Sequence, residues 1–397
     1  MASSINASTT TGLVSTADLS GILNLQSNGT TIATVQSTGF SLPTASTINA
    51  ANTFGFENRI INGGMTIDQR NAGASVSTPT TSAWTYFLDR WAYYCTSAAK
   101  YSVQQNAGAV TPPAGFTNYL GVTSLAATTV GATDVYDLRQ PVEGFNVADF
   151  GWGTANAKTV TLSFWVRSSL TGTFGGTVTN SAQNRCYPFS YTISSANTWE
   201  QKSVTIAGDT SGTWLTTNGA GLFLVFGLGV GSNFLGTAGA WTGTFYVSVT
   251  GSTNVVSTNG ATWYITGVQL EVGSQATSFD FRSIGQEFLL CQRYYSQTAT
   301  YGSLPTTAGI SGYRGAIAYA TTQATGGFYF PCEMRTTPTV TPYSANGTSG
   351  VWTLPGNVNT GATTANSVGT NGFMYFIGSS YTVSTIIYGS WTASAEL

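Results

Sequence analysis

Apolar and polar residues alternate through much of the chain between residues 57 and 282, and turn residues interrupt the alternation at short intervals. In the segment 159–169 every second residue is apolar, and these residues are Val160, Leu162, Phe164 and Val166. A period of two places such residues on one face of a strand. We therefore predict that this segment is a strand with one buried face.

Three further segments carry strand patterns. Residues 222–230 form a continuous apolar run, which suits a strand buried on both faces. Residues 244–250 alternate through Phe245, Val247 and Val249. Residues 263–272 alternate through Tyr264, Thr266, Val268, Leu270 and Val272. Many short strands joined by Gly, Ser and Asn turns predict a β-sandwich or jelly roll.

One segment has the period of a helix instead. Ser283 and Gln286 have the spacing of a capping box, which starts a helix by satisfying its free amide groups. The apolar residues that follow repeat on one helical face, and they are Ile284, Phe288, Cys291 and Tyr295. We predict one short linking helix over residues 283–296.

We predict that the first 56 residues form a separate segment. Two alternating runs within residues 23–35 flank Asn28 and Gly29, a pair that favours a tight hairpin turn because both residues tolerate positive φ. One hairpin cannot bury a core alone. We expect the segment to pair with other copies or with a docking partner.

Short strand patterns return after the predicted helix, at residues 312–320, 326–334, 339–345, 372–379 and 384–393. The predicted fold is therefore mainly β. It comprises an N-terminal β-hairpin attachment segment (1–56), a central jelly-roll β-sandwich (57–282), the linking helix (283–296) and a small C-terminal β-domain (297–397).

Charge is scarce. The chain has 397 residues, of which 7% are charged, whereas ordinary soluble domains carry about 25%. Residues 19–56, 210–270 and 336–395 hold no charged residue at all. Such segments suit β-rich layers, subunit interfaces or surfaces that meet polar, uncharged ligands.

Composition excludes several classes of function. The chain has no histidine, so Ser-His-Asp, Cys-His and His-bearing zinc sites cannot form within one chain. Its 13 Lys and Arg against 15 Asp and Glu leave a net charge of −2, without the positive charge on which nucleic-acid binding mostly rests. We expect no nucleic-acid partner.

The four cysteines lie far apart in the sequence, at Cys95, Cys186, Cys291 and Cys332, and no paired spacing indicates metal or redox chemistry. We predict free, mostly buried thiols.

The first residues lack a basic region and an apolar stretch, and no apolar run reaches about 18 residues. We expect neither secretion nor membrane insertion.

Three blocks of sequence resemble virion appendage proteins of tailed bacteriophages, of the tail-fibre or receptor-binding type. The first comprises NRIINGGMTIDQR (58–70) and LDRWAYY (88–94). The second is ITGVQLEVGSQATSFDFRSIGQEFLLCQRYY (265–295), which resembles the block that closes the central jelly roll of such proteins. The third, FPCEMRTTPTVTPY (330–343), is similar to the opening of their C-terminal β-module.

The resemblance implies a homotrimeric, non-enzymatic fibre. Its N-terminus would dock on the virion attachment protein, and its distal part would bind a host-surface glycan. Its central jelly roll is similar to carbohydrate-binding modules. Residues 1–56 are too short for a long shaft. A short fibre, or one attached to the capsid, therefore fits the sequence better than a long jointed fibre.

Sugar binding needs flat aromatic faces with amide and hydroxyl groups beside them. Aromatic residues in loops rich in Gly, Asn and Thr meet this requirement, and they are Trp214, Trp241, Tyr313, Tyr343 and Trp352. The alternative for each ring is packing against a neighbouring loop or subunit. We take the group as the candidate carbohydrate site.

Seven residues within the resembling blocks are interpreted as structural. We expect Asp89 and Arg90 to be hydrogen-bonded at a strand end, while Trp91 fills the core of the sandwich. We expect Asp68 and Arg70 to form an ion pair. Gln269 and Glu271 complete the structural motif.

Catalysis is the weaker alternative. Glycoside cleavage needs two carboxylates roughly 5–10 Å apart, and Asp134 with Asp137, or Glu200 with Asp209, could supply such a pair. We assign no catalytic residue and expect no enzyme activity.

The sequence has no Asp-rich loop with calcium-binding spacing, so we expect no metal or other cofactor. A structural calcium ion is the alternative.

The sequence thus predicts a structural virion protein, a short trimeric tail fibre that adsorbs to a host-surface polysaccharide. We expect it to be made in the host cytoplasm and to reside in the virion, on the tail rather than the capsid. A head fibre or adaptor with an architectural role is the first alternative, and a polysaccharide depolymerase is the second.

Overall fold

The computed structural model describes residues 23–27, 30–36, 39–41, 57–78 and 83–397, in two units divided after Gly55. In the first unit β1 (Leu23–Ser27), β2 (Thr30–Gln36) and β3 (Gly39–Ser41) form an antiparallel sheet. The predicted pairing of the two alternating runs is confirmed. The Asn28-Gly29 turn lies outside the described residues, and the attachment role of 1–56 stays a prediction.

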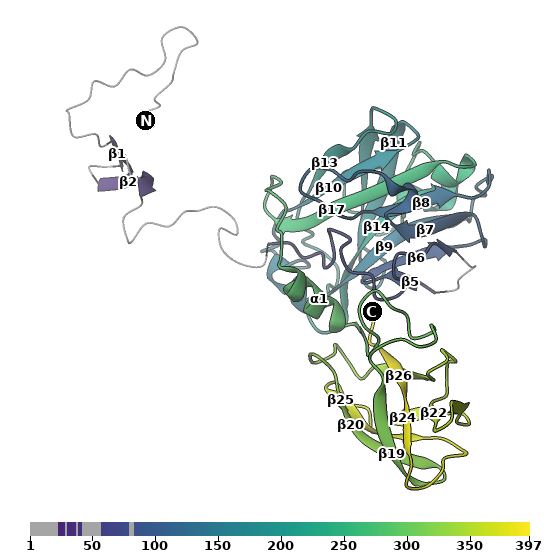
Figure 1. Cartoon of the computed structure of the whole chain (residues 1–397). Helices are drawn as coiled ribbons and strands as arrows, with labels where there is room; N and C mark the ends of the chain where they lie inside the picture. Colours follow the sequence, from purple (N-terminus) through teal and green to yellow (C-terminus); the bar gives the residue numbers. More distant parts are fainter. Residues whose placement is uncertain (1–22, 28–29, 37–38, 42–56, 79–82) are drawn as a thin grey trace. The chain divides into compact units, whose positions relative to one another are not determined.

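The second unit begins with two six-stranded antiparallel sheets that pack face to face, the predicted jelly-roll β-sandwich (Figure 1). The strands of the first sheet, in spatial order, are β13 (Glu200–Ile206), β10 (Val160–Ser168), β17 (Thr262–Val272), β8 (Leu120–Ser124), β7 (Tyr101–Gln105) and β4 (Val76–Ser77). Those of the second are β12 (Cys186–Ile193), β11 (Gly172–Asn180), β14 (Ala220–Val230), β9 (Val135–Glu143), β6 (Trp91–Cys95) and β5 (Thr85–Leu88).

Short elements lie between these strands. A two-stranded parallel ladder is formed by β15 (Leu235–Gly236) and β16 (Ser248–Val249). Of the predicted strand 244–250, only Ser248 and Val249 lie in a strand, so that prediction is largely wrong. The 3-10 turns are η1 (Ala107–Ala109), η2 (Gly144–Asn146), η3 (Ala148–Phe150), η4 (Ser232–Phe234) and η5 (Val255–Ser257).

The core of the sandwich confirms the strongest sequence patterns. The alternating apolar residues of β10, from Val160 to Val166, are fully buried between the sheets. Strand β14 is buried on both faces, as its continuous apolar run predicts. Leu224 and Phe226 face the other sheet, while Phe223 and Val225 join a second cluster with Phe234, Phe245 and Val247.

The predicted face of β17 is wrong in its first half. Trp263 and Ile265, rather than Tyr264 and Thr266, belong to the sandwich core, whereas Val268 and Leu270 face it as predicted. The pairing with β10 slips by one residue around Gly267, whose φ is +61°. A bulge of this kind inserts one extra residue and exchanges the two faces.

The predicted helix is present as α1 (Ile284–Gln292). The Ser283 side chain accepts a bond from the backbone nitrogen of Gln286 at 3.4 Å, which confirms the predicted cap. Cys291 is buried, but Ile284 is 64% exposed, so the predicted apolar face is only partly buried. The helix ends before Tyr295, which begins the next strand.

The remaining chain forms one sheet around the long strand β26 (Ile386–Ser394), which pairs with four others. Its other strands are β18 (Tyr295–Gln297), β19 (Arg314–Ala320), β20 (Gln323–Tyr329), β21 (Thr339–Tyr343), β22 (Thr353–Leu354), β23 (Val358–Asn359), β24 (Thr364–Asn366) and β25 (Gly372–Ile377). Five of the nine strands, β19, β20, β21, β25 and β26, overlap predicted segments, and the overlap of β20 with the predicted 326–334 covers residues 326–329 only. The sheet has a core of its own, and the proposed boundaries at residues 282 and 296 stay predictions.

All four cysteines lie in the described part of the chain and are free, as predicted, with Cys332 half-buried and the other three buried. Among the described residues, no helix combines the length and apolar character needed to cross a membrane.

Candidate functional site

A pocket of about 520 Å³ opens on the C-terminal sheet, and we name it the tyrosine pocket. Strands β22, β23 and β26 and the loops before β19 and after β21 supply its walls. Its lining residues are all uncharged, and they are Ala308, Gly309, Tyr313, Ala345, Asn346, Thr353, Asn357, Asn359 and Tyr388. One residue of the predicted carbohydrate site, Tyr313, is among them.

Two tyrosine rings dominate the pocket. The ring centroids of Tyr313 and Tyr388 lie 6.1 Å apart, with the ring planes inclined at 58°. The Tyr313 hydroxyl donates to the carbonyl oxygen of Ala345 at 2.7 Å, and the Tyr388 hydroxyl donates to Asn357 Oδ1 at 2.8 Å. Because both hydroxyls are anchored, the rings are held in place before any ligand arrives.

Amide and hydroxyl groups surround the rings. Asn357 Oδ1 accepts from Tyr388, and Asn346 Oδ1 accepts from Thr348. Since these oxygens are occupied, the NH₂ groups of both asparagines are the atoms left to donate to a ligand. Thr353 Oγ1 accepts from the backbone nitrogen of Ala345 at 2.7 Å, which ties β22 to the loop after β21.

This set of groups suits a neutral, polyhydroxylated ligand. Aromatic faces can cover the apolar faces of a sugar ring, while amides and hydroxyls replace the water bound to its hydroxyl groups. A charged ligand would lose its hydration without meeting an opposite charge, because no lining residue is charged.

Trp352 does not line this pocket, and its contacts favour the packing alternative for this ring. The side chain is fully buried. Its ring centroid lies 4.2 Å from that of Phe376, and its Nε1 donates to the carbonyl oxygen of Ser390 at 3.1 Å. The loop that carries Trp352 nevertheless lines the pocket, through Thr353 and Asn357.

Tyr343 is half-buried on β21, where it pairs with Ser390, and it is not among the lining residues of the tyrosine pocket.

The lining residues that sequence reasoning missed are Tyr388 and the asparagines. Tyr388 lies in a predicted strand, where alternation gave no reason to separate it from other strand residues. Asn346 and Asn357 lie at the two ends of the loop selected for Trp352.

Trp214 and Trp241 do not line the tyrosine pocket. They lie together in a cluster with Trp152. The three ring centroids are 4.7 to 5.4 Å apart, and each pair packs edge to face. Trp214 Nε1 donates to the carbonyl of Ser211, and Trp241 Nε1 donates to that of Ala207. These contacts favour the packing alternative for both rings, and their role in sugar binding stays a prediction.

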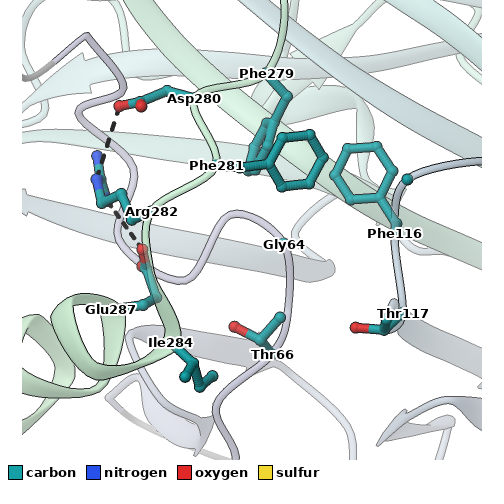
Figure 2. A pocket seen from close by; sticks show the side chains of 11 residues that line it. Gly64, Thr66, Phe116, Thr117, Phe279, Asp280, Phe281, Arg282, Ile284 and Glu287 are labelled. Atoms are coloured by element: carbon teal, nitrogen blue, oxygen red, sulfur yellow. Dashed lines mark hydrogen bonds and ion pairs between the residues drawn. The ribbon is translucent and has the colours of Figure 1, made fainter.

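A second pocket, of about 300 Å³, is lined by three phenylalanines (Figure 2). The ring centroids of Phe116, Phe279 and Phe281 lie 4.8 to 5.2 Å apart. Figure 2 shows the guanidinium group of Arg282 between two carboxylates on the side away from the rings. Those carboxylates are engaged by that cation, so the pocket suits an apolar group better than a sugar.

Arg282 contacts two carboxylates and two backbone carbonyls. Its side chain is 4% exposed and lies 3.3 Å from Glu287 and 3.8 Å from Asp280. It also donates to the backbone carbonyls of Asn58 and Ile60. Arg282 therefore fastens the start of α1 to the start of the second unit, which is a structural role.

A third hollow, of about 200 Å³, lies over the outer face of the second sandwich sheet. Trp84 and Tyr94 cover the guanidinium of Arg139, whose Cζ lies 4.9 and 5.5 Å from the two ring centroids. Arg139 forms two bonds to Asp137, which is fully buried. The cation and its carboxylate satisfy one another, so this hollow offers few free polar groups.

Trp91 fills the core of the sandwich and Asp89 is hydrogen-bonded, as expected from the sequence. Trp91 is fully buried in the sandwich core, and its Nε1 donates to the carbonyl of Asn62 at 3.1 Å. Asp89 is buried and accepts from the backbone and side-chain nitrogens of Gln69 at 2.7 and 2.5 Å. Burial raises the pKa of Asp89 to about 7, although Arg70 and the bonds from Gln69 lower it.

The predicted ion pair between Asp68 and Arg70 is not formed. Asp68 instead accepts from the backbone nitrogens of Arg70, Asn71 and Gly73, at 3.2, 2.9 and 2.7 Å, and so closes a turn. The guanidinium of Arg70 is paired with Glu396 at 2.8 Å. A short aspartate side chain bonds its neighbouring amides more easily than a guanidinium two residues away.

Glu396 is the centre of a polar junction between segments distant in sequence. It accepts from both Arg70 and Arg90, and its side chain is 6% exposed. Arg335 donates to the backbone carbonyls of Ala395 and Glu396, each at 2.7 Å. A second carboxylate, described next, completes the junction.

Glu143 binds the residues that follow α1. Arg293 donates to its two carboxylate oxygens at 2.6 and 3.0 Å, and the Tyr294 hydroxyl donates to one of them. The Cζ atom of Arg90 lies 3.6 Å from the ring centroid of Tyr294, which links the two carboxylate centres. Arginines from the segments 58–70, 88–94, 265–295 and 330–343 all contribute to this junction.

Gln269 and Glu271 are also structural. Gln269 donates to Glu271 at 3.0 Å and accepts from the backbone nitrogen of Asp280 at 2.7 Å. Glu271 accepts from the backbone nitrogen of Thr277 at 2.9 Å. Together they fasten the segment after β17 to that strand.

The carboxylates considered for catalysis have partners of their own. Asp137 is bonded to Arg139 and Asp209 to Arg185, while Glu200 is paired with Lys202. Asp134 accepts from the backbone nitrogen of Gly131. Within the described residues, no group of three or more His, Cys, Asp or Glu side chains could hold a metal ion.

No protein-family model matches the chain, and no curated protein matches it. Among solved structures it is similar to the enzymatically active domain of tailspike protein 4 of bacteriophage CBA120, with 13% identity, a TM-score of 0.29 and coverage of 54% of this chain and 21% of that one. The chain therefore spans about a fifth of that protein's length.

Carbohydrate-binding modules are also among the similar structures. TmCBM61 in complex with beta-1,4-galactotriose has 10% identity and a TM-score of 0.27, with coverage of 55% of this chain and 100% of that one. The family 11 module of Clostridium thermocellum, in complex with a mixed-linked tetrasaccharide, has 11% identity and a TM-score of 0.26, with coverage of 51% and 98%. TM-scores of this size carry no functional argument, so function has to be inferred from this chain's own residues.

Proposed function

We propose that the protein binds a neutral polysaccharide of a host-cell surface through the tyrosine pocket. The observation that carries the proposal is the pair of anchored rings, Tyr313 and Tyr388, set among asparagine amides with no charged residue in the lining. Sugars present apolar ring faces and many hydroxyl groups, and this pocket offers a complement to both.

The absence of charge from the lining predicts how binding responds to salt. Interactions between exposed charges weaken as salt screens them. A pocket that binds through ring contacts and neutral hydrogen bonds lacks that dependence. Affinity for the glycan should therefore be nearly the same at low and high ionic strength.

The proposed setting is a bacteriophage virion, in which the protein is a short, homotrimeric and non-enzymatic tail fibre. This setting rests on the resemblance of the blocks at 58–70, 88–94, 265–295 and 330–343 to tail-fibre proteins. Residues 1–56 would attach the fibre to the particle, and the C-terminal sheet would meet the cell. No metal or other cofactor is part of the proposal.

A glycan array tests the binding function. The full chain is applied at 50 and 500 mM salt beside the variants Asn357→Ala and Asn233→Ala. Asn357 lines the pocket, whereas Asn233 is an exposed asparagine in η4 and serves as the matched control. We expect salt-resistant binding that Asn357→Ala weakens and Asn233→Ala preserves. Binding to no neutral glycan, or equal loss in both variants, would contradict the proposal.

The same glycan tests the non-enzymatic part of the proposal. Incubation of the bound polysaccharide with the protein should leave its chain length unchanged. Shortened products would show a depolymerase instead. Labelled protein that decorates virions but never cells would favour the architectural head fibre.

A further inference from the structure

The outer face of the C-terminal sheet exposes several large apolar side chains. The side chains that point away from the core of this sheet are Ile317 (55% exposed), Tyr319 (51%), Tyr329 (81%), Met374 (60%) and Ile386 (59%). We name them the outer patch. Large exposed apolar patches commonly mark interaction sites.

The alternation in β19 is inverted relative to an ordinary surface strand. Its small residues Ala316 and Ala318 face the core, whereas the larger Ile317 and Tyr319 face outward. A sheet with one solvated face normally places polar residues on that side. The inversion indicates that the outer side of this strand is covered in the assembled protein.

Two residues of the outer patch lie opposite one another, in a row that also includes one residue from each of two further strands. Ile317 on β19 lies directly opposite Ile386 on β26 and opposite Thr325 on β20, which in turn lies opposite Tyr375 on β25. Side chains opposite one another in a ladder are in contact distance. One row of side chains therefore spans four strands.

We propose that a second copy of this chain covers the outer patch. Apart from Arg314 at the beginning of β19, strands β19, β20, β25 and β26 contain no charged residue. Two such faces can meet without burying an unpaired charge, and interfaces between identical subunits are the most apolar class. These strands therefore offer a charged partner no ion pair except one with Arg314.

A glycan is a poorer occupant than a second copy. Three of its five side chains, Ile317, Met374 and Ile386, have no group that could bond sugar hydroxyls, and the Tyr319 hydroxyl already donates to Gln323. A polysaccharide laid over the outer patch would therefore lose more hydration than these side chains replace. At the areas typical of such side chains, their exposed parts present on the order of 500 Å². That is most of the roughly 800 Å² that each partner of a stable interface buries.

The outer patch adjoins the tyrosine pocket. Ile386 and Tyr388 are two residues apart on β26, on the same side of the strand, with the buried Ile387 between them on the other side. A second copy over the outer patch would thus border the proposed glycan site. The inference rests on the proposed assembly of identical subunits and adds the surface that forms it.

The test measures the molar mass of the full chain by light scattering during gel filtration, for the wild type, Ile317→Lys, Ile386→Lys and the control Phe145→Lys. Phe145 is 60% exposed on η2, outside the outer patch. We expect the wild type and the control to be multimers. Each isoleucine variant should have a dissociation constant raised at least tenfold, with the far-UV circular dichroism spectrum of the wild type.

Cross-linking identifies the occupant. A benzophenone amino acid replaces Tyr319 in a mixture of light and ¹⁵N-labelled copies, and cross-linked peptides are found by mass spectrometry. We expect peptides from residues 314–329 or 372–388 that join a light to a heavy copy. Cross-links confined to other regions of the second copy would overturn the inference.

The outcomes separate this inference from the proposed function. A multimeric wild type whose isoleucine variants remain multimeric would overturn the outer patch as the interface and leave the trimer standing. A wild type that stays monomeric at 50 µM would overturn both the interface and the trimer. Binding on the glycan array is read independently of either result.

Discussion

The hydroxyl of Tyr388 donates to Asn357 Oδ1 at 2.8 Å, so a ring on the central strand β26 is fixed by an amide from the loop after β22. The bond has two effects on the tyrosine pocket. It sets the inclination of the ring, and it leaves the NH₂ group of Asn357 free to donate. Two groups that a sugar would use are therefore positioned by one contact.

Replacing Tyr388 should separate these two effects. Tyr388→Ala removes a ring surface worth about 0.5–1.5 kcal/mol, so we expect glycan affinity to fall by about two- to twelvefold. Tyr388→Phe keeps the ring and loses only the bond to Asn357, so its affinity should lie between those of wild type and Tyr388→Ala. Titration calorimetry measures the difference, with Phe145→Ala as a control for an exposed aromatic residue elsewhere. Equal affinities for all four proteins would remove Tyr388 from the site.

Trp352 should matter for stability rather than for binding. It is fully buried and packs against Phe376 and Phe328. Trp352→Ala should lower the free energy of unfolding by about 3–5 kcal/mol, whereas Trp352→Phe should cost less. Chemical denaturation followed by circular dichroism gives the values. A fully stable Trp352→Ala variant that fails to bind glycan would instead restore the sequence prediction for this ring.

The polar junction should respond strongly to the loss of Glu396. Glu396→Gln leaves the buried Arg90 without its carboxylate, and such a change typically costs about 3–5 kcal/mol. Asp149→Asn is the control, because Asp149 pairs with Arg59 at a site where it is 43% exposed. The control should cost less than about 1 kcal/mol. Similar urea midpoints for the two variants would show that the junction contributes little.

Stability should decrease as pH rises from about 4 to 7. The pKa of Asp89 is about 7 in the folded chain because of burial, against about 3.9 in an unfolded one. In that window the folded chain holds a proton that the unfolded chain has released, so raising the pH favours unfolding. Burial also raises the pKa of Asp137 and of Asp68, which acts in the same direction.

Urea midpoints at pH 5 and pH 8 check this dependence. The wild type should be more stable at pH 5, and Asp89→Asn should show a smaller difference between the two conditions. Asp149→Asn should show the same difference as the wild type. An Asp89→Asn variant with the full wild-type difference would mean that other groups cause it.

The fold could be predicted from the sequence where local pattern and burial agree. Strand β10 alternates strictly and has one buried face, and α1 begins at a capping residue that the sequence identifies. The prediction failed at Gly267, because a bulge exchanges the two faces of β17 without any change in local composition. Pairing register depends on the neighbouring strand, which one sequence does not reveal.

The site could be predicted only in part, for a related reason. The composition of the loop around Trp352 indicated a binding region, and that loop does line the pocket. The particular ring was wrong, because loop composition does not show which side chain turns inward. Tyr388 could not have been selected, since it becomes a pocket residue only when β26 pairs with β19 and β22.

Hydrogen exchange of the full chain, with and without the glycan found on the array, tests the central claim most directly. The account predicts slower exchange in residues 345–359 and 386–390, which border the tyrosine pocket, and unchanged exchange in the loops that carry Trp214 and Trp241. Protection of those tryptophan loops, with none at 345–359 or 386–390, would contradict this account. It would place the binding site in the jelly roll.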